Sequence, residues 1–305
     1  MKTNAIVRIV IWSVVIVALV GVMALGLFPW LIRDTFFDNG PPAETAIPVP
    51  LETEAVMLPL QPLPNEGELR LNPDSIQEIE IEWVAGDIVI LAMDTENISI
   101  SESDVTNEQY SMIFKTEGKK LEIQFCKDLL MPELRINLSD NLKKDLYIEV
   151  PRGWTGHSIE IDTADTNVEM HDITLNTLDI DSADGTCDFQ NCNIGDLDID
   201  TADGDIYYLG TLDTLDFDAA SASFTGELLT TPSRIDMDTM DGKLDLALPE
   251  DCGFTLSMDG VSSQLSSDFN GTSTKNGSYI YGDGRCRINV DGMLCDVTLR
   301  KLEAK

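Results

Sequence analysis

The amino-acid sequence of 305 residues predicts an all-β protein. We expect a β-solenoid, a β-helix-like stack of two-strand coils of about 20 residues each, preceded by one N-terminal transmembrane helix. Two observations lead to this prediction: a long charge-free apolar segment near the N-terminus, and a repeated unit in which apolar and acidic residues alternate. A chance run of turns in an ordinary β-sandwich is the alternative to the repeat.

The apolar segment covers residues 9–32, none of which is charged. As a helix it would be about 36 Å long, against a hydrocarbon core of about 30 Å. Lys2 and Arg8 lie in the preceding residues 1–8, so the positive-inside rule predicts that this short tail is cytoplasmic. The predicted localisation is the plasma membrane, single-pass, with an extracellular C-terminal domain. A cleaved secretory signal is the alternative, because small residues near the end of the segment could imitate a cleavage site.

Residues 33–70 are rich in Pro and Glu and predict an extended extracellular linker, because Pro cannot pair in a central strand. The β-solenoid domain is expected over the remaining residues, 71–305. Less regular strands are expected at 110–115, 120–125, 134–138 and 145–150, and polar loops at 101–109 and 268–284.

The repeated unit is clearest at residues 178–189 and 197–208. In the second copy Leu197 and Ile199 point to one side of a strand and Asp198 to the other, which is strand periodicity. A unit of this size cannot bury its own apolar face, so the units must stack, and we expect them to stack in chain order. The Asp after the second apolar residue marks seven copies: Asp162, Asp181, Asp200, Asp218, Asp238, Asp259 and Asp291.

The turn between the two strands of a coil also recurs. Asp203 and Gly204 are one such turn, in which Gly adopts a backbone conformation with positive φ. Small residues are expected to fill the inside of each corner: Ala164, Ala183, Ala202 and Ala220.

The charge of the chain limits its partners. With 20 basic and 54 acidic residues the net charge is −34, and beyond residue 33 the balance is 17 − 54 = −37. Such a surface repels phosphate backbones, so nucleic acid is excluded as a partner. Contact of the domain with anionic lipid is disfavoured for the same reason, which leaves the N-terminal helix as the predicted membrane contact.

The acidic repeat raises the question of a metal. Stacked strands place equivalent carboxylates about 4.8 Å apart, so they either stay solvated or recruit cations. Calcium is the candidate cation, since it accepts six to eight oxygen ligands in flexible geometry. The candidate ligands are Asp179, Asp181, Asp184, Asp198, Asp200, Asp203, Asp216 and Asp218. The alternative is a solvated acidic face that keeps strand edges from pairing.

No catalytic residues and no other cofactor are predicted. His157 and His171 lack Cys or His at metal-ligand spacing, and no phosphate loop or nucleophile elbow occurs. Carboxylate pairs leave a polysaccharide-active enzyme as the alternative class. The six cysteines could form disulfides in an exported protein, with Cys187–Cys192 and Cys286–Cys295 close enough in sequence, or could stay as buried thiols.

Several short motifs carry a resemblance to a known family. They are residues 79–90, 147–151 and 246–249 and the Asp-Gly turns at 184–185, 203–204 and 241–242. With these motifs the chain resembles the bacterial putative adhesin domain family over about residues 76–300. The resemblance implies an exported β-solenoid-like domain, often on membrane-anchored proteins, and no catalytic residues.

The expected function is therefore a non-catalytic binding, adhesion or structural module at the bacterial cell envelope. Its expected partner is a cell-envelope or surface ligand, protein or glycan. Tyr279 and Tyr281, in the loop at 268–284, are expected to supply specific contacts. A membrane component of an envelope-stress sensing system is a further alternative.

Overall fold

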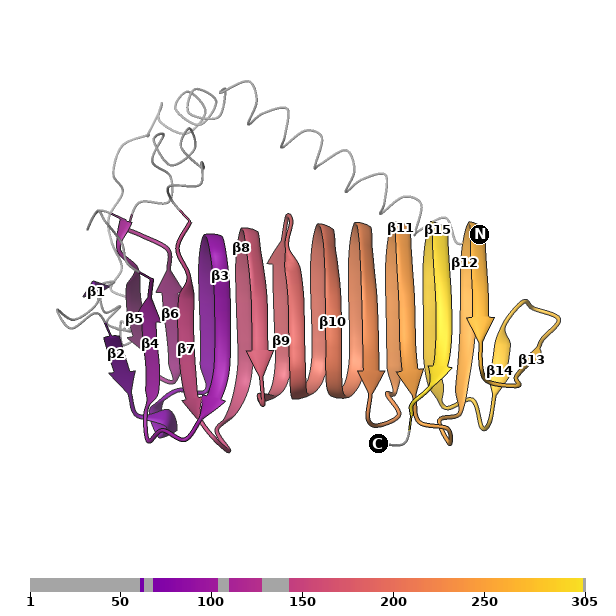
Figure 1. Ribbon diagram of the computed structural model, residues 1–305, viewed down its shortest axis with the longest axis horizontal. Coiled ribbons are helices and arrows are strands. Elements are labelled where there is room, and N and C mark those ends of the chain that lie inside the picture. The colour runs from indigo at the N-terminus through magenta and orange to yellow at the C-terminus, as the bar shows by residue number, and fades with distance from the viewer. Residues whose placement is uncertain (1–60, 63–67, 104–109, 128–142, 304–305) are drawn as a thin grey trace, which may run out of the picture. The chain divides into compact units, whose positions relative to one another are not determined.

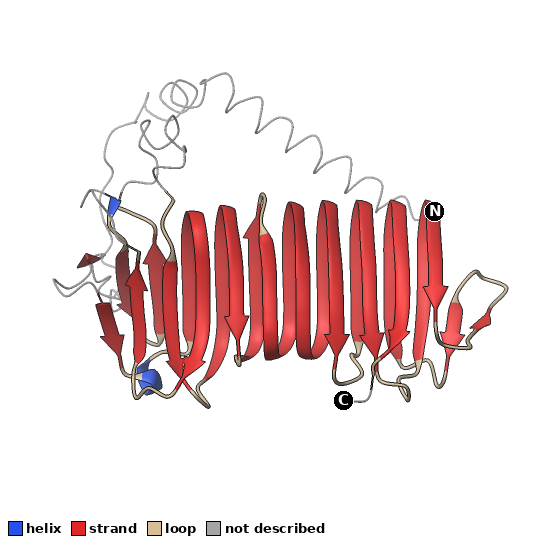
Figure 2. Cartoon of the chain, viewed as in Figure 1, coloured by secondary structure: helices blue, strands red, loops and turns tan. Residues whose placement is uncertain are grey.

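The computed structural model describes residues 61–62, 68–103, 110–127 and 143–303. All of them belong to one compact unit, Val56–Lys305. Apart from a short 3-10 turn at Pro73–Ser75, the regular structure described is β-strand, which confirms the prediction of an all-β chain (Figure 2).

The predicted membrane span is not supported. Within the described residues, no helix has the length and apolar character needed to cross a lipid bilayer. The expected tail at 1–8 and helix at 9–32, most of the linker, and the expected strand at 134–138 lie outside the described residues. On this finding the prediction of a single-pass plasma-membrane protein with an extracellular domain is wrong, because the described chain alternates apolar and polar residues in strands instead.

The strands form one open sheet of 15 members. Their bounds are β1 (Gln61–Pro62), β2 (Glu68–Leu71), β3 (Glu78–Met93), β4 (Ile98–Glu102), β5 (Ile113–Glu117), β6 (Lys120–Gln124), β7 (Leu146–Pro151), β8 (Thr155–His171), β9 (Thr174–Ser182), β10 (Thr186–Leu228), β11 (Arg234–Leu248), β12 (Phe254–Ser267), β13 (Thr272–Ser273), β14 (Tyr279–Tyr281) and β15 (Cys286–Lys301). Figure 1 shows the long strands side by side, from β3 to β12.

The long strands are bent rungs, each with a first arm, a corner and a second arm. In β11 the first arm pairs in parallel with β10 from Arg234 to Thr239, and the second arm from Asp241 to Ala247. Met240, at the corner, has no place in this register. β10 is longer because it runs without interruption through 43 residues, from the second arm of one rung to the second arm of another.

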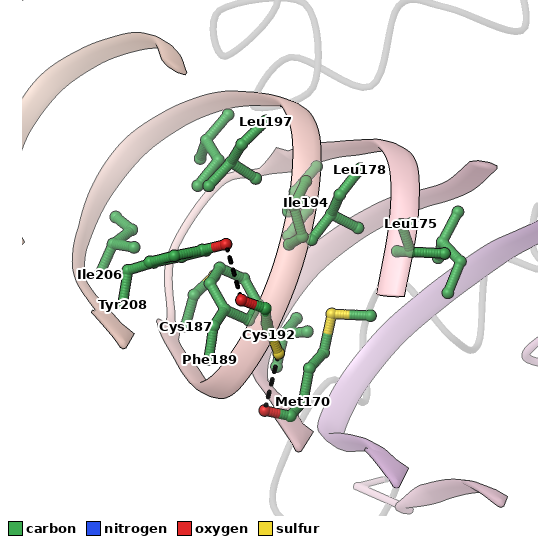
Figure 3. Packing of buried hydrophobic residues seen from close by; sticks show 14 of the residues in the cluster. Met170, Leu175, Leu178, Cys187, Phe189, Cys192, Ile194, Leu197, Ile206 and Tyr208 are labelled. Carbon is green, nitrogen blue, oxygen red and sulfur yellow. Dashed lines mark hydrogen bonds between the residues drawn. The ribbon is translucent and has the colours of Figure 1, made fainter. Parts of the chain in front are cut away.

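The predicted register of the apolar residues is confirmed. Leu178 pairs with Ile159 on one side and with Leu197 on the other, and all three are at most 1% exposed. Figure 3 shows Leu178, Leu197 and the second-arm residue Phe189 packed together in the core. Tyr208 is 2% exposed, and its hydroxyl donates to the carbonyl of Thr211 at 2.7 Å. Since the same positions are buried in successive rungs, the core is continuous between the arms.

The inside of the corner differs from the prediction. Ala164, Ala183 and Ala202 are exposed, and Ala220 is partly exposed, so alanines do not fill it. The alternation of the first arm continues through the residue that precedes each exposed alanine, such as Ser182 before Ala183. This residue turns its side-chain hydroxyl inward. Ser182 Oγ donates to the carbonyl of Asp184 at 3.0 Å, and equivalent bonds join Thr201 to Asp203 and Thr239 to Asp241. These hydroxyls therefore hydrogen-bond backbone carbonyl groups at the turn.

The order of the last rungs also differs from the prediction. β15 lies between β11 and β12, so the chain builds the outermost long rung before the one inside it. The inward residues explain this order. In β15 they are Ile288, Val290, Val297 and Leu299, each at most 1% exposed. The equivalent position to Leu299 in β12 is Ser267, so the more apolar strand is buried between neighbours.

The N-terminal end of the stack is held by a buried ion pair. Lys144 and Glu102 form a salt bridge, and their side chains are only 5% and 7% exposed. Lys144 Nζ also donates to the carbonyl of Tyr110 at 2.7 Å and lies 4.3 Å from the ring centroid of Phe125. Burial lowers the pKa of Lys144 in spite of its carboxylate partner. This pair joins the strands that precede the regular rungs.

Candidate binding face

The first arms present two columns of carboxylates on their outer side, which we call the carboxylate face. β10 contributes two successive first arms to these columns. The hydrogen bond that Thr214 donates to Asp196, 18 residues earlier, shows that these two arms lie side by side. One column is Glu122, Glu80, Glu160, Asp179, Asp198, Asp216 and Asp236. The other is Glu82, Asp162, Asp181, Asp200, Asp218, Asp238, Asp291 and Asp259. Neighbours in a column lie about 4.8 Å apart along the stack.

Partial burial, together with the charges of neighbouring acids, raises the pKa values of several of these groups. Partial burial, followed by the charges of Asp238 and Asp200, raises the pKa of Asp218 to about 7. Burial and the charge of Asp181 raise the pKa of Asp162 in the same way. The pKa values of Glu82, Glu160, Asp179, Asp198 and Asp200 are raised too, in each case first by burial. These seven carboxyl groups therefore hold their protons more tightly than isolated carboxylates do.

One arginine interrupts the columns. Arg234 lies 2.9 Å from Asp216 and 3.3 Å from Asp236, measured between nitrogen and carboxylate oxygen. Beside it is a surface groove, lined by Thr177, Asp179, Asp196, Leu197, Asp198, Thr214, Asp216, Ser233 and Arg234. The sequence signal for this groove is that Arg234 is one of two basic residues in the acidic stretch 158–268. The groove combines carboxylates, hydroxyls and a guanidinium, a set that can hydrogen-bond a polar ligand.

The structure separates the predicted calcium ligands into two groups. Six of them lie in the two columns: Asp179, Asp181, Asp198, Asp200, Asp216 and Asp218. Asp184 and Asp203 lie past the corner, outside both columns. Among the residues that the structure describes, no group of three or more His, Cys, Asp or Glu is placed to hold a metal ion. Calcium binding stays a prediction for the six column residues.

The outer side of the second arms is different, and we call it the mixed face. Asn167 donates to Asp87 at 2.9 Å and accepts from the hydroxyl of Thr186 at 2.9 Å. Ser223 donates to Asp205 in the same manner. Although Glu169 and Asp188 are neighbours, most acids on this face lie beside neutral or basic residues, so no long carboxylate column forms there.

The remaining candidate groups are placed for structural roles. His157 is exposed, and its Nδ1 lies 3.1 Å from the side-chain amide of Asn176. Tyr279 and Tyr281, expected to contact a ligand, instead pack against Phe254 with ring centroids 6.2 and 5.7 Å away. The Tyr281 hydroxyl donates to the carbonyl of Glu250 at 3.1 Å. The two tyrosines therefore cover the core at the end of the stack, and ligand contacts from them stay a prediction.

All six cysteines are buried, and none of them forms a disulfide bond. Burial raises the pKa of Cys187 to about 12. The candidate pairs Cys187–Cys192 and Cys286–Cys295, which the sequence left open, are not bonded. Cys286 is instead hydrogen-bonded to the thiol of Cys252, which precedes β12.

The fold agrees with a family found by comparison. Residues 76–211 and 159–300 each match the Toastrack DUF4097 domain, and together they span 76–300. The chain belongs to the Toastrack DUF4097 family. This confirms the resemblance seen in the sequence motifs. No curated protein matches the chain.

Three solved structures are similar to the chain at low sequence identity. A putative cell adhesion protein from Clostridium sporogenes is 13% identical, with a TM-score of 0.39, covering 77% of this chain and 97% of that one. A putative adhesin from Bacteroides fragilis is 12% identical, with a TM-score of 0.44 and coverage of 76% and 95%. A putative lipid binding protein from Parabacteroides distasonis is 14% identical, with a TM-score of 0.40 and coverage of 76% and 94%.

Proposed function

We propose that the chain is a non-catalytic binding module whose carboxylate face contacts a cell-envelope or surface ligand that carries positive charge. The ligand is a protein or a glycan with cationic groups. The observation that carries the proposal is the pair of columns, which present carboxylates at the regular spacing of the rungs. A cationic partner relieves the repulsion within the columns, whereas an anionic partner would add to it.

The repetition of the acids supports binding more than catalysis. A glycosidase needs two carboxyl groups in distinct environments, one holding its proton and one ionised. Here Asp162, Asp179, Asp198 and Asp200 have pKa values raised by the same causes, burial and neighbouring acids. Arg234 and the groove beside it supply a local feature that could orient a ligand on the face.

The test is ligand binding by the full chain to chitosan oligomers, which are cationic glycans, and to a lysine-rich peptide. Acetylated chitin oligomers are the neutral control. We expect binding of the cationic probes that weakens as salt is added, since exposed charges are screened. Binding of neutral and cationic probes with equal affinity, or of neither, would contradict the proposal.

Matched variants locate the binding. The triple substitution Asp181→Asn, Asp200→Asn, Asp218→Asn removes three charges from the carboxylate face. The control Asp188→Asn, Asp205→Asn, Asp296→Asn removes the same charge elsewhere. We expect roughly tenfold weaker binding, about 1.4 kcal/mol, for the first set only. Calorimetric titration of both sets of variants with Ca²⁺ tests the predicted calcium ligands. The heat of Ca²⁺ binding should be lost in the first set and kept in the control set.

A further inference from the structure

The outermost long rung, β12, leaves most of one edge open. On one side it pairs with β15 along its whole length, from Phe254 to Ser267. On the other side β14 covers only Phe254, Thr255 and Leu256. Within the described part of the chain, no strand pairs with residues 257–267 on that side. Figure 1 shows β12 at the end of the stack with the β13–β14 hairpin beside only one end of it.

This edge lacks the features by which β-proteins normally prevent pairing. Residues 257–267 contain no Pro, Lys, Arg or Glu, and Asp259 is their only charged residue. An interior stretch such as 194–208 carries five Asp instead. The strands that end the sheet on the N-terminal side, β1 and β2, are only two and four residues long. A long, nearly uncharged edge is a template for another strand.

Apolar side chains are exposed along the same end of the stack. Val261 at the corner of β12 is 84% exposed, and the inward-facing Leu265 is 37% exposed. The register places Leu294 of β15 beside Ser262, and Leu294 is 50% exposed. Met240 and Met293 are also exposed, at the corners where earlier rungs carry Ala. Exposed apolar patches next to an unpaired edge are characteristic of an interface.

We propose that the edge at 257–267 pairs antiparallel with the same edge of a second copy of the chain. The two stacks then join end to end about a two-fold axis, with Leu265 and Val261 of each copy covered by the other. A second copy fits because a two-fold contact uses the same surface on both partners. The charge distribution favours this contact: two chains of net charge −34 repel, and the edge with a single Asp is where that repulsion is smallest.

The test is analytical ultracentrifugation of the full chain across a range of concentrations, together with the variants Leu265→Lys and Val261→Glu. Both positions are exposed, so the variants should fold, which their melting temperatures check. The matched control for Val261→Glu is Ala202→Glu, which adds the same negative charge at the corner of an interior rung. We expect a monomer–dimer equilibrium for the natural chain and the control, and at least tenfold weaker association for both edge variants.

Hydrogen exchange distinguishes the remaining outcomes. Amides of residues 257–267 should become more protected as the chain is concentrated, and this gain should be lost in Leu265→Lys. A chain that stays monomeric at all concentrations overturns the proposal. An edge that is already protected in the monomer also overturns it, because another segment of the same chain would then cover the edge. Association that both edge variants retain overturns it too, because the contact then lies elsewhere.

Discussion

The interior rungs and the N-terminal end of the same stack are stabilised in different ways. In the interior, each rung repeats its neighbour, so Leu178 packs between Ile159 and Leu197 and no single contact is unique. At the N-terminal end the strands are short and irregular, and one buried pair, Lys144 and Glu102, joins several of them. Repetition spreads stability over many equivalent contacts, whereas the irregular end depends on a few.

The largest effect should come from breaking the buried pair. Lys144→Met leaves the Glu102 carboxylate buried without its cation, so we expect a loss of about 3–5 kcal/mol in the free energy of unfolding, measured by urea denaturation. Adding Glu102→Gln removes that charge and should restore at least half of the loss. Equal stability of the single and double variants would mean that the uncompensated charge is not the cause.

A corner of an interior rung should be the next most sensitive position. Gly185 has φ = 143°, and an added Cβ would lie 2.0 Å from the carbonyl oxygen of Thr166 in the next rung. We expect Gly185→Ala to cost about 3 kcal/mol, from the strained backbone and the displaced rung together. Gly118→Ala is the control, since its φ is also positive at 60° but its Cβ would meet no atom within 4 Å. Similar losses for both variants would show that the contact between rungs does not matter.

The smallest effect should come from the carboxylate face. Because the pKa of Asp218 is raised to about 7, the folded chain holds its proton more tightly than the unfolded chain, and stability falls as pH rises from about 4 to 7. Asp218→Asn avoids this loss and should be more stable by up to about 1 kcal/mol at pH 8, with the difference vanishing near pH 4. Asp188→Asn on the mixed face is the control. A gain that does not depend on pH would contradict the explanation.

The same comparison shows which parts could be predicted from the sequence. Period-two alternation predicts the inward positions of Leu178 and Leu197, because the pleat fixes them locally. The alternation also passes through Lys144, which is in phase with Leu146 and Ile148, and this signal could have identified the buried lysine. A charged residue in phase with a core is easily assigned to a loop, since only its partner Glu102 makes its burial favourable.

Other features have no local signal. The order of β11, β15 and β12 depends on comparing whole strands for apolar content, and the spacing between Asp259 and Asp291 indicates only that a loop intervenes. The exposure of Ala183 depends on the path of the corner, where Ser182 turns inward. The groove at Arg234 brings together four rungs, so its composition follows from the stacking register.

The position of β15 also constrains the order in which the chain can fold during synthesis. β12 leaves the ribosome before β15, yet β15 is its neighbour along its whole length. Residues 254–267 therefore lack their long neighbour of the finished stack until residues 286–301 have been made. β12 must therefore wait, beside β11 or away from it, until β15 inserts between the two. Completion of the stack is thus tied to the synthesis of β15 rather than to the steady addition of rungs.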